Sequence, residues 1–399
     1  MPWGRARVLD PGGGLAQDTA MLDLRPHFSR FLGSDPQRLH FAAHSHHPWP
    51  DVTRDAQLAA WDLAAQRIDG KWEAVLGPLW QRLQGRIAGL LNLPDPATLV
   101  FAPNTHEFVG RILSALPVGR VPRVLTTDGE FHSFARQAAR LEEEGLLAVT
   151  RIPAEPAAEC LPRLVEAARG GGYDLIWVSQ VMYQTGAVLE GLEALAGAAG
   201  EAALVIDGYH AFMARPVDLS GLAGRAFYLA GGYKYAMGGE GCCFLHCPPG
   251  WLPRPRLTGW YAAFAALAAP GGGTPYATDG QRFMGATFDP SGLFRLDAAL
   301  GWAAAQGLDP ATIHAHARAL QARFLERQGE TLLAGARLAA PGPVRGNFLA
   351  FELAGAGEWQ ARLAALGIVT DHRGERLRLG FGLYQSEAEL DALLARLRR

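Results

Sequence analysis

The stretch that decides the fold is AFYLAGGYKYAMGGEGCCFLHC, residues 226–247. It starts with AFYLA, which has the continuous apolar character of a buried strand, and a glycine-rich turn that carries Lys234 follows. A second apolar run, ALVID, ends at Asp207, 27 positions before the lysine. Glycines on both sides of Lys234 let the backbone approach a bulky ligand. The two runs predict a lysine and a carboxylate at neighbouring strand ends.

A lysine and a carboxylate in these positions are what pyridoxal 5'-phosphate (PLP) requires. The amine forms a Schiff base with the aldehyde of the cofactor, and the carboxylate keeps the pyridine nitrogen protonated so that the ring accepts electrons. A carboxylate buried at a strand end needs a partner, and a pyridinium N–H is one. The alternative is a surface lysine in a turn. We expect a phosphate-binding segment and a ring-stacking group elsewhere in the chain.

Strand-like and helix-like segments alternate from about Thr98 onwards. The strand-like runs are TLVFA, VLTT, DLIWVSQ, ALVID and AFYLA, and the helical segments include EFVGRILSAL, in which Phe108, Ile112 and Leu116 share one face. This alternation predicts an α/β fold with a mainly parallel sheet. Ligands of such sheets bind at the carboxyl ends of the strands, and the candidate residues follow these runs.

The last hundred residues have a different pattern. After a long alanine-rich helical stretch come NFLAFEL, the helix EWQARLAALG, RLRLGFG and a final helix that opens with a capping box, Ser386 and Glu389. We expect three parts: an N-terminal segment, residues 1–40, that packs on the small domain; a large PLP-binding domain, 41–295; and a small C-terminal α+β domain, 296–399.

Two segments that follow predicted strands could hold the cofactor's phosphate and ring. Asn104, Thr105 and His106 open a predicted helix, whose free backbone N–H groups attract phosphate. The alternative is an ordinary helix cap without a ligand. Phe131 and His132 follow the next strand and offer a flat face for stacking. The alternative there is a helix entry with Phe131 packed into the core.

Two more candidates stand beside the aspartate and the lysine. His210 follows Asp207 by three residues and could reach either the phenolic or a phosphate oxygen of the cofactor, or be a hydrogen-bonded core histidine. Tyr233 directly precedes Lys234 and can direct its hydroxyl at phosphate.

The segment FAAHSHHPWP, residues 41–50, contains His44, His46 and His47. Three histidines suggest zinc, but no cysteine or carboxylate stands at zinc-like spacing, so we expect no metal. A loop that contacts the substrate is the better interpretation, with Ser45 and His44 as candidate contacts.

Composition narrows the class of protein further. The 37 basic residues nearly balance the 39 acidic ones and are scattered, which argues against nucleic acid as a partner. No apolar run approaches the ~18 residues of a membrane span, and the N-terminus lacks a signal-peptide core, so we expect no membrane partner and a cytoplasmic location. The four cysteines, which have no disulfide-like spacing, agree with a reducing compartment: Cys160, Cys242, Cys243 and Cys247.

These motifs resemble the class V, fold type I PLP-dependent enzymes, and among them most closely the kynureninases. The resemblance rests on Asp-x-x-His at Asp207, on the Tyr-Lys-Tyr around Lys234 with its glycines, and on TGWY at 258–261. FAAHSHHPWP stands where kynureninases have an Asn-Ser-Leu-Gly loop, and RLRLGFGLYQSEAEL, 376–390, resembles the family's C-terminal arginine strand. The resemblance runs from about residue 38 to the end of the chain.

Carried over by position, the resemblance implies a role for each site residue. Lys234 would form the Schiff base, Asp207 would pair with the pyridine nitrogen, and Arg378, six residues before Tyr384, would bind the substrate α-carboxylate. The resemblance also implies the fold type I architecture, with a mainly parallel, seven-stranded sheet, and a homodimer with active sites at its interface. The remaining implied cofactor contacts are Phe131 or His132 for stacking, Thr105, Tyr233 and His210 for phosphate or phenolic oxygen, and Trp260 and Thr287 across the dimer interface.

The reaction implied by the resemblance is a hydrolytic Cβ–Cγ cleavage of a small-molecule amino acid that gives alanine and an aryl acid such as anthranilate. Lys234 would remove the α-proton, with its pKa held below the solution value by burial and positive charge. The alternatives are a class V aminotransferase, a cysteine desulfurase or selenocysteine lyase, and a catalytically inactive regulatory module of the same fold. No cysteine follows Cys247, which disfavours the desulfurase.

Overall fold

Short apolar runs form the centre of the protein, as the sequence predicts. The computed structural model describes residues 23–266 and 273–398. Its seven-stranded sheet has the order β2 (Leu99–Ala102), β8 (Cys243–His246), β7 (Ala226–Gly231), β6 (Ala203–Asp207), β5 (Leu175–Ser179), β3 (Arg123–Thr127) and β4 (Ala148–Ile152). Only β8 runs antiparallel to its neighbours. The inner strands are buried along their whole length, which explains their continuous apolar character.

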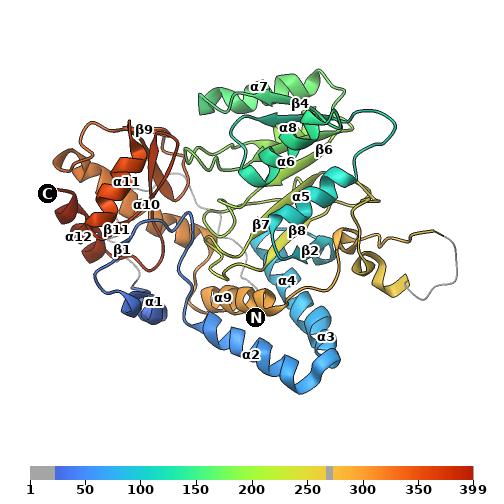
Figure 1. Ribbon diagram of the computed structural model, residues 1–399, viewed down its shortest axis with the longest axis horizontal. Helices are drawn as coiled ribbons and strands as arrows, with labels where there is room; N and C mark the ends of the chain where they lie inside the picture. The colour runs from blue at the N-terminus through green and yellow to red at the C-terminus, as the bar shows by residue number, and fades with distance from the viewer. Residues whose placement is uncertain (1–22, 267–272, 399) are drawn as a thin grey trace, which may run out of the picture.

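Helices cover both faces of this sheet (Figure 1). Helix α5 (Thr105–Ser114) packs against α6 (His132–Glu143), and α7 (Ala157–Arg169) packs against α8 (Leu192–Ala198). The connections through α5 and α6 run along the sheet towards β4, and those through α7 and α8 run back from β4. Because crossovers between parallel strands are right-handed, the two helix pairs lie on opposite faces of the sheet. Below them in Figure 1 lie α2 (Val52–Arg67), α3 (Lys71–Ala74), α4 (Trp80–Leu91) and α9 (Ser291–Ala305).

A second, antiparallel sheet lies to the left in Figure 1. Its strand order is β12 (Asp371–Arg373), β13 (Arg376–Gly380), β10 (Phe348–Glu352) and β9 (Arg337–Leu338). Three helices accompany it: α10 (Pro310–Arg327), α11 (Ala356–Ala365) and α12 (Glu387–Leu397). The capping box of Ser386 and Glu389 opens α12 as predicted. The predicted fold class, a mainly parallel α/β sheet with a smaller α+β part, is confirmed.

The packing bears on the expected division of the chain. Residues 1–22 of the expected N-terminal segment lie outside the described residues, and the rest includes α1 (Ser29–Ser34) and β1 (Leu39–His40), which pairs with β11 (Ile368–Val369). Helix α9 crosses the expected boundary at residue 296, but its buried residues pack in the core of the large sheet. The division stays a proposal, and this packing favours a boundary beyond α9. No helix in the described ranges is both long and apolar enough to cross a bilayer.

Candidate active site

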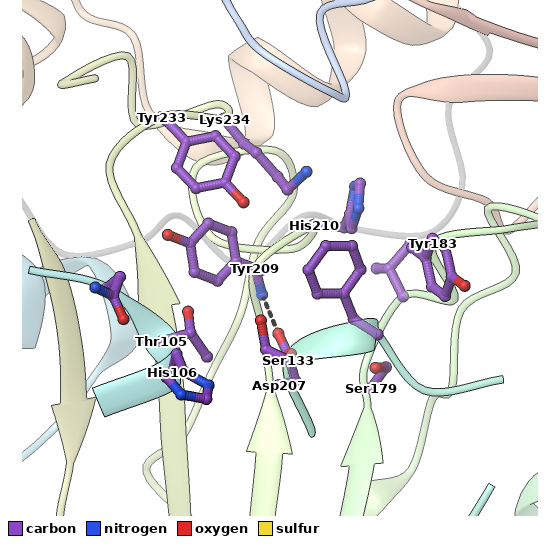
Figure 2. Close-up of a pocket in the computed structure, with 13 residues that line it drawn as sticks. Thr105, His106, Ser133, Ser179, Tyr183, Asp207, Tyr209, His210, Tyr233 and Lys234 are labelled. Atoms are coloured by element: carbon purple, nitrogen blue, oxygen red, sulfur yellow. Dashed lines mark hydrogen bonds between the residues drawn. The ribbon is translucent and has the colours of Figure 1, made fainter. Parts of the chain in front are cut away.

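The carboxyl ends of the parallel strands open into one pocket (Figure 2). Its cavity volume is about 160 Å³. Strands β6 and β7, paired side by side, bring Asp207 and Lys234 to the same pocket, as the sequence predicts. The lining residues are Asn104, Thr105, His106, Phe131, Ser133, Ser179, Val181, Tyr183, Asp207, Tyr209, His210, Tyr233 and Lys234.

Asp207 ends strand β6 at the floor of the pocket. Its side chain accepts a hydrogen bond from the backbone N–H of Tyr209 at 3.0 Å. Burial raises the pKa of this carboxyl to about 6, although the Tyr209 hydrogen bond and the charge of Lys234 oppose the shift. These two interactions do not offset the cost of burying the carboxylate. A cationic N–H donor would stabilise it further, and a pyridinium nitrogen supplies one.

Lys234 lies in the turn after strand β7 and is only 7% exposed. Its Nζ donates hydrogen bonds to the carbonyl oxygens of His44 at 3.0 Å and Ser45 at 3.4 Å. Burial and the nearby Arg378 guanidinium lower its pKa to about 7 from its ordinary value of 10.5. The lowered pKa increases the neutral fraction of the amine near pH 7, which makes it available as a nucleophile or base.

Only two lysines occur in the whole sequence, Lys71 and Lys234. Lys71 opens helix α3, where its Nζ donates to the carbonyl of Ile68 at 3.1 Å and lies 5.3 Å from the centre of the Trp72 ring. It does not line the pocket. A Schiff base at this pocket therefore has one lysine available to it.

The N-terminus of α5 faces the pocket from the end of strand β2. The Asn104 side chain caps the helix by accepting a hydrogen bond from the N–H of Glu107 at 3.1 Å. The backbone N–H groups of the first turn that this cap does not use are the usual donors to a phosphate. Thr105 is buried, with its Oγ1 3.4 Å from the Sγ of Cys243. The predicted helix cap is therefore present, and the phosphate site at the same helix N-terminus stays a prediction.

Phe131 and His132, which the sequence leaves as alternatives for ring stacking, take different positions. Phe131 has extended backbone angles as the N-cap of α6 and lines the pocket. His132, the first residue of the helix, is exposed and does not line the pocket; its Nε2 lies 3.5 Å from the hydroxyl of Tyr183. This geometry favours Phe131.

Three ring side chains border the space above Asp207. His210 is buried, and its Nδ1 has no hydrogen-bond partner among the described residues. Burial, followed by the charge of Lys234, holds the pKa of His210 well below its usual range, so the ring is neutral. The rings of Tyr209 and Tyr233 lie 5.0 Å apart beside it. A buried ring nitrogen without a partner is unusual in a folded protein, and a phenolic or phosphate oxygen of a ligand is one candidate partner.

The predicted substrate-contacting residues lie next to the pocket rather than in its wall. His44 and Ser45 reach Lys234 through their carbonyl oxygens, whereas the His44 ring is fully buried with its Nε2 2.9 Å from Oδ1 of Asp371. Arg378 donates to the carbonyl of Tyr183, which lines the pocket.

The other two histidines of the segment 41–50 have separate partners. Nε2 of His46 is 3.5 Å from Glu240, and His47 Nδ1 is 2.7 Å from the Pro48 carbonyl.

Trp260 and Thr287 lie on the surface, outside the pocket of their own chain. Trp260 is 44% exposed and stacks on Tyr261 with 4.1 Å between the rings. Thr287 is also exposed. The expectation that both reach the cofactor of a second subunit stays a prediction.

The residues at or beneath the site that were missed from the sequence include Ser179, Tyr209 and Glu130. Ser179 ends strand β5, so the rule that identified Asp207 would have found it. Tyr209 lies between two residues that were identified. Glu130 is buried beneath the pocket, where it accepts hydrogen bonds at 2.6 Å from the hydroxyls of Thr127 and Ser179. Burial raises the pKa of Glu130 to about 7.

Comparisons with known proteins agree with this geometry. Residues 75–356, more than half of the chain, match the family model described as aminotransferase class-V. No curated protein sequence matches the chain. A mutant of C-DES with glycine covalently linked to its PLP cofactor superposes with a TM-score of 0.78 at 19% identity, over 94% of this chain and 98% of that one.

Two further solved structures have the same fold. The complex of the cystine C–S lyase C-DES with its product cysteine persulfide has a TM-score of 0.76 at 20% identity, over 90% of this chain and 97% of that one. The apo cysteine desulfurase from Thermococcus onnurineus NA1 has a TM-score of 0.75 at 20% identity, over 91% of this chain and 94% of that one.

The chain belongs to the class V aminotransferase family. It is a PLP-dependent enzyme of fold type I, as predicted. The solved structures named above are of C-DES, a cystine C–S lyase, and of a cysteine desulfurase, and none of them is a kynureninase. The narrower resemblance to kynureninases therefore belongs to the proposal that follows.

Proposed function

We propose that this protein cleaves an α-amino acid at its side chain, with Lys234 as the residue that binds PLP covalently and then carries the α-proton. The observation that carries the proposal is the convergence of Lys234 and Asp207 on one pocket, opposite the N-terminus of α5. PLP, when bound, supplies a ring that accepts electrons from the substrate's α-carbon.

The chain's own residues have separate tasks in this proposal. Asp207 pairs with the pyridine nitrogen, and Phe131 stacks on the ring. The first turn of α5, with Asn104, Thr105 and His106, binds phosphate through backbone N–H groups. His210, whose Nδ1 has no hydrogen-bond partner among the described residues, would contact the phenolic oxygen. Tyr233 adds a hydroxyl beside the phosphate.

Lys234 moves the proton. The carbonyl oxygens of His44 and Ser45 accept hydrogen bonds from its amine, and they would orient the free amine without a negative charge that favours its protonated form. A pKa of about 7 suits both removal and return of a proton near neutral pH. Arg378 and the charges around it take the substrate carboxylate.

The side-chain cleavage that we propose is the kynureninase-like one, hydrolysis of the Cβ–Cγ bond next to a γ-carbonyl. Nζ of Lys234 lies 5.1 Å from the ring centre of Tyr233 and 5.9 Å from that of Tyr209, and Tyr233 stacks on His46 with their centres 5.1 Å apart. Such rings suit an aryl side chain. A desulfurase that forms a persulfide on its own cysteine is disfavoured because all four cysteines are buried, and burial raises the pKa of Cys243 to about 12.

A second candidate is the elimination of sulfur from an amino acid such as cystine, without a protein persulfide. The similarity of fold to the cystine C–S lyase C-DES supports it. A class V aminotransferase is the remaining enzyme alternative. The proposal includes a homodimer in which Trp260 and Thr287 approach the partner's pocket.

One set of assays on the holoenzyme separates these reactions. Kynurenine and 3-hydroxykynurenine are expected to yield alanine with anthranilate or its hydroxylated analogue. Pyruvate from cystine, without alanine from kynurenine, would favour the C–S lyase instead. Return of the cofactor from its amine form by a keto acid would indicate an aminotransferase. No product from any substrate would favour the inactive regulatory module.

The rate of covalent PLP uptake by the apoprotein is expected to rise from pH 6 to 8 and to level off above that. The reason is the pKa of Lys234 near 7, since only the neutral amine attacks the aldehyde. Stopped-flow absorbance measures the rate, and N-acetyl-lysine serves as the control, whose rate should keep rising towards pH 10. A protein profile parallel to that of N-acetyl-lysine would mean that the Lys234 pKa is not lowered.

A further inference from the structure

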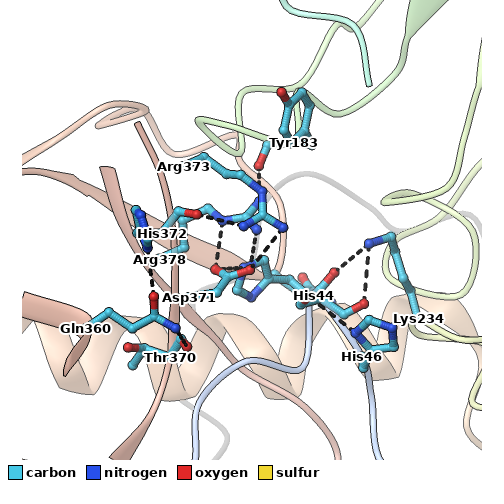
Figure 3. A network of polar contacts seen from close by, with 12 residues as sticks. His44, His46, Tyr183, Lys234, Gln360, Thr370, Asp371, His372, Arg373 and Arg378 are labelled. Carbon is cyan, nitrogen blue, oxygen red and sulfur yellow. Dashed lines mark hydrogen bonds and ion pairs between the residues drawn. The ribbon is translucent and has the colours of Figure 1, made fainter. Parts of the chain in front are cut away.

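A cluster of charged side chains connects the small sheet to His44 and Ser45, whose carbonyl oxygens accept hydrogen bonds from Lys234 (Figure 3). Asp371 in β12 is paired directly with Arg378 in β13. Oδ1 of Asp371 accepts a hydrogen bond from Nε of Arg378 at 2.8 Å, and its Oδ2 accepts one from Nη2. The same Oδ1 lies 2.9 Å from Nε2 of His44. Asp371 thus occupies the side of the Arg378 guanidinium that would otherwise hold a carboxylate in two parallel hydrogen bonds.

Arg378 has few donors left for a substrate. Its Nη1 donates to the carbonyl of Tyr183, so each of its three nitrogens already has a protein acceptor. The residue is only 2% exposed. The arginine that the resemblance assigns to the substrate carboxylate is therefore both neutralised and nearly enclosed.

Arg373 is the second guanidinium of the cluster, and it is more available. Its Nη2 lies 3.7 Å from Oδ2 of Asp371, too far for a hydrogen bond. Its Nη1 donates at 2.7 Å to the carbonyl of the adjacent His372, and 37% of the side chain is exposed. Arg373 therefore keeps N–H donors for a ligand.

The charges of the cluster sum to one positive charge. Arg373 and Arg378 contribute two, and Asp371 removes one, because His44 and Arg378 hold its pKa well below its usual range although burial alone would raise it. Burial lowers the pKa of His44 to about 4, which leaves that ring neutral. Both arginines also lower the pKa of Lys234, so their charge reaches the pocket. One net positive charge matches one carboxylate.

We propose that Arg373 is a substrate-binding residue that contacts the α-carboxylate together with the remaining N–H groups of Arg378, while Asp371 fixes the orientation of Arg378. This rests on the proposed function, in which the substrate is an α-amino acid. Asp371 prevents Arg378 from turning away, and Arg373 restores the positive charge that Asp371 removes.

The test compares Arg373→Gln with wild type in the holoenzyme, using L-alanine and L-alaninamide as probes. Binding is followed by the change in visible cofactor absorbance. Arg373→Gln is expected to weaken alanine binding about tenfold, because a charge-assisted contact to carboxylate is lost. Binding of alaninamide, which lacks the carboxylate, should change less than about twofold. Arg362→Gln is the matched control, since Arg362 is an exposed arginine on α11, against Trp359.

Three outcomes would overturn the inference. Unchanged alanine binding in Arg373→Gln would show that this arginine does not contact the carboxylate. Equal weakening of alanine and alaninamide would indicate a structural effect instead. Absence of any response to either probe in wild type would remove the proposed function itself, and this inference with it.

Discussion

Replacing Lys234 with alanine is expected to remove both the visible absorbance of the bound cofactor and measurable turnover. The chain has no second lysine at the pocket, so nothing replaces the lost covalent bond or the lost base. Loss of a group that acts as both nucleophile and base lowers turnover by at least ~10³-fold. Absorbance of the purified protein with added PLP and product formation at saturating substrate measure the two effects.

Lys71→Ala is the matched control for this variant, since it removes the only other lysine. It should keep the absorbance and the turnover of wild type. Thermal unfolding of both variants shows whether the fold survives, and we expect it to, because alanine leaves no buried charge behind. Retained turnover in Lys234→Ala would mean that the covalent role belongs elsewhere.

Replacing Asp207 with asparagine is expected to have the second largest effect. Asparagine keeps the shape and can still accept the hydrogen bond from the Tyr209 N–H, but it removes the negative charge opposite the pyridine nitrogen. The ring then no longer stays protonated, and its capacity to accept electrons falls. A lost electrostatic contact of this kind raises the barrier by about 3 to 4 kcal/mol, which is about 10²- to 10³-fold in kcat.

Asp218→Asn is a suitable control because Asp218 is an exposed aspartate in the same connection between β6 and β7. It should leave kcat unchanged. A loss of less than about threefold in Asp207→Asn would contradict the role assigned to that carboxylate, since the expected loss is far larger.

The arrangement of Lys234 and Asp207 could be predicted because both follow uninterrupted apolar runs. A buried parallel strand is apolar at every position instead of at alternate positions. The first polar residue after each run therefore marks the end of the strand at the edge of the sheet. The same rule applies to Ser179. The choice between Phe131 and His132 could not be made, because it depends on the residue at which α6 begins, and helix ends vary by a residue or two.

The charged cluster could not be predicted from the sequence. His44 and Asp371 are 327 positions apart, and no local pattern links a turn near the start of the chain to a short strand near its end. The domain boundary was uncertain for a related reason. Helix α9 is rich in alanine and has apolar residues on several sides, so its sequence does not specify which of two cores it joins.

The most direct test of the central claim is to reduce the PLP-loaded protein with borohydride, digest it and locate the fixed cofactor by mass spectrometry. We predict a phosphopyridoxyl group on the peptide that contains Lys234 and an unmodified peptide around Lys71. A modified Lys71, or no modified lysine in a protein that has bound PLP, would contradict the account.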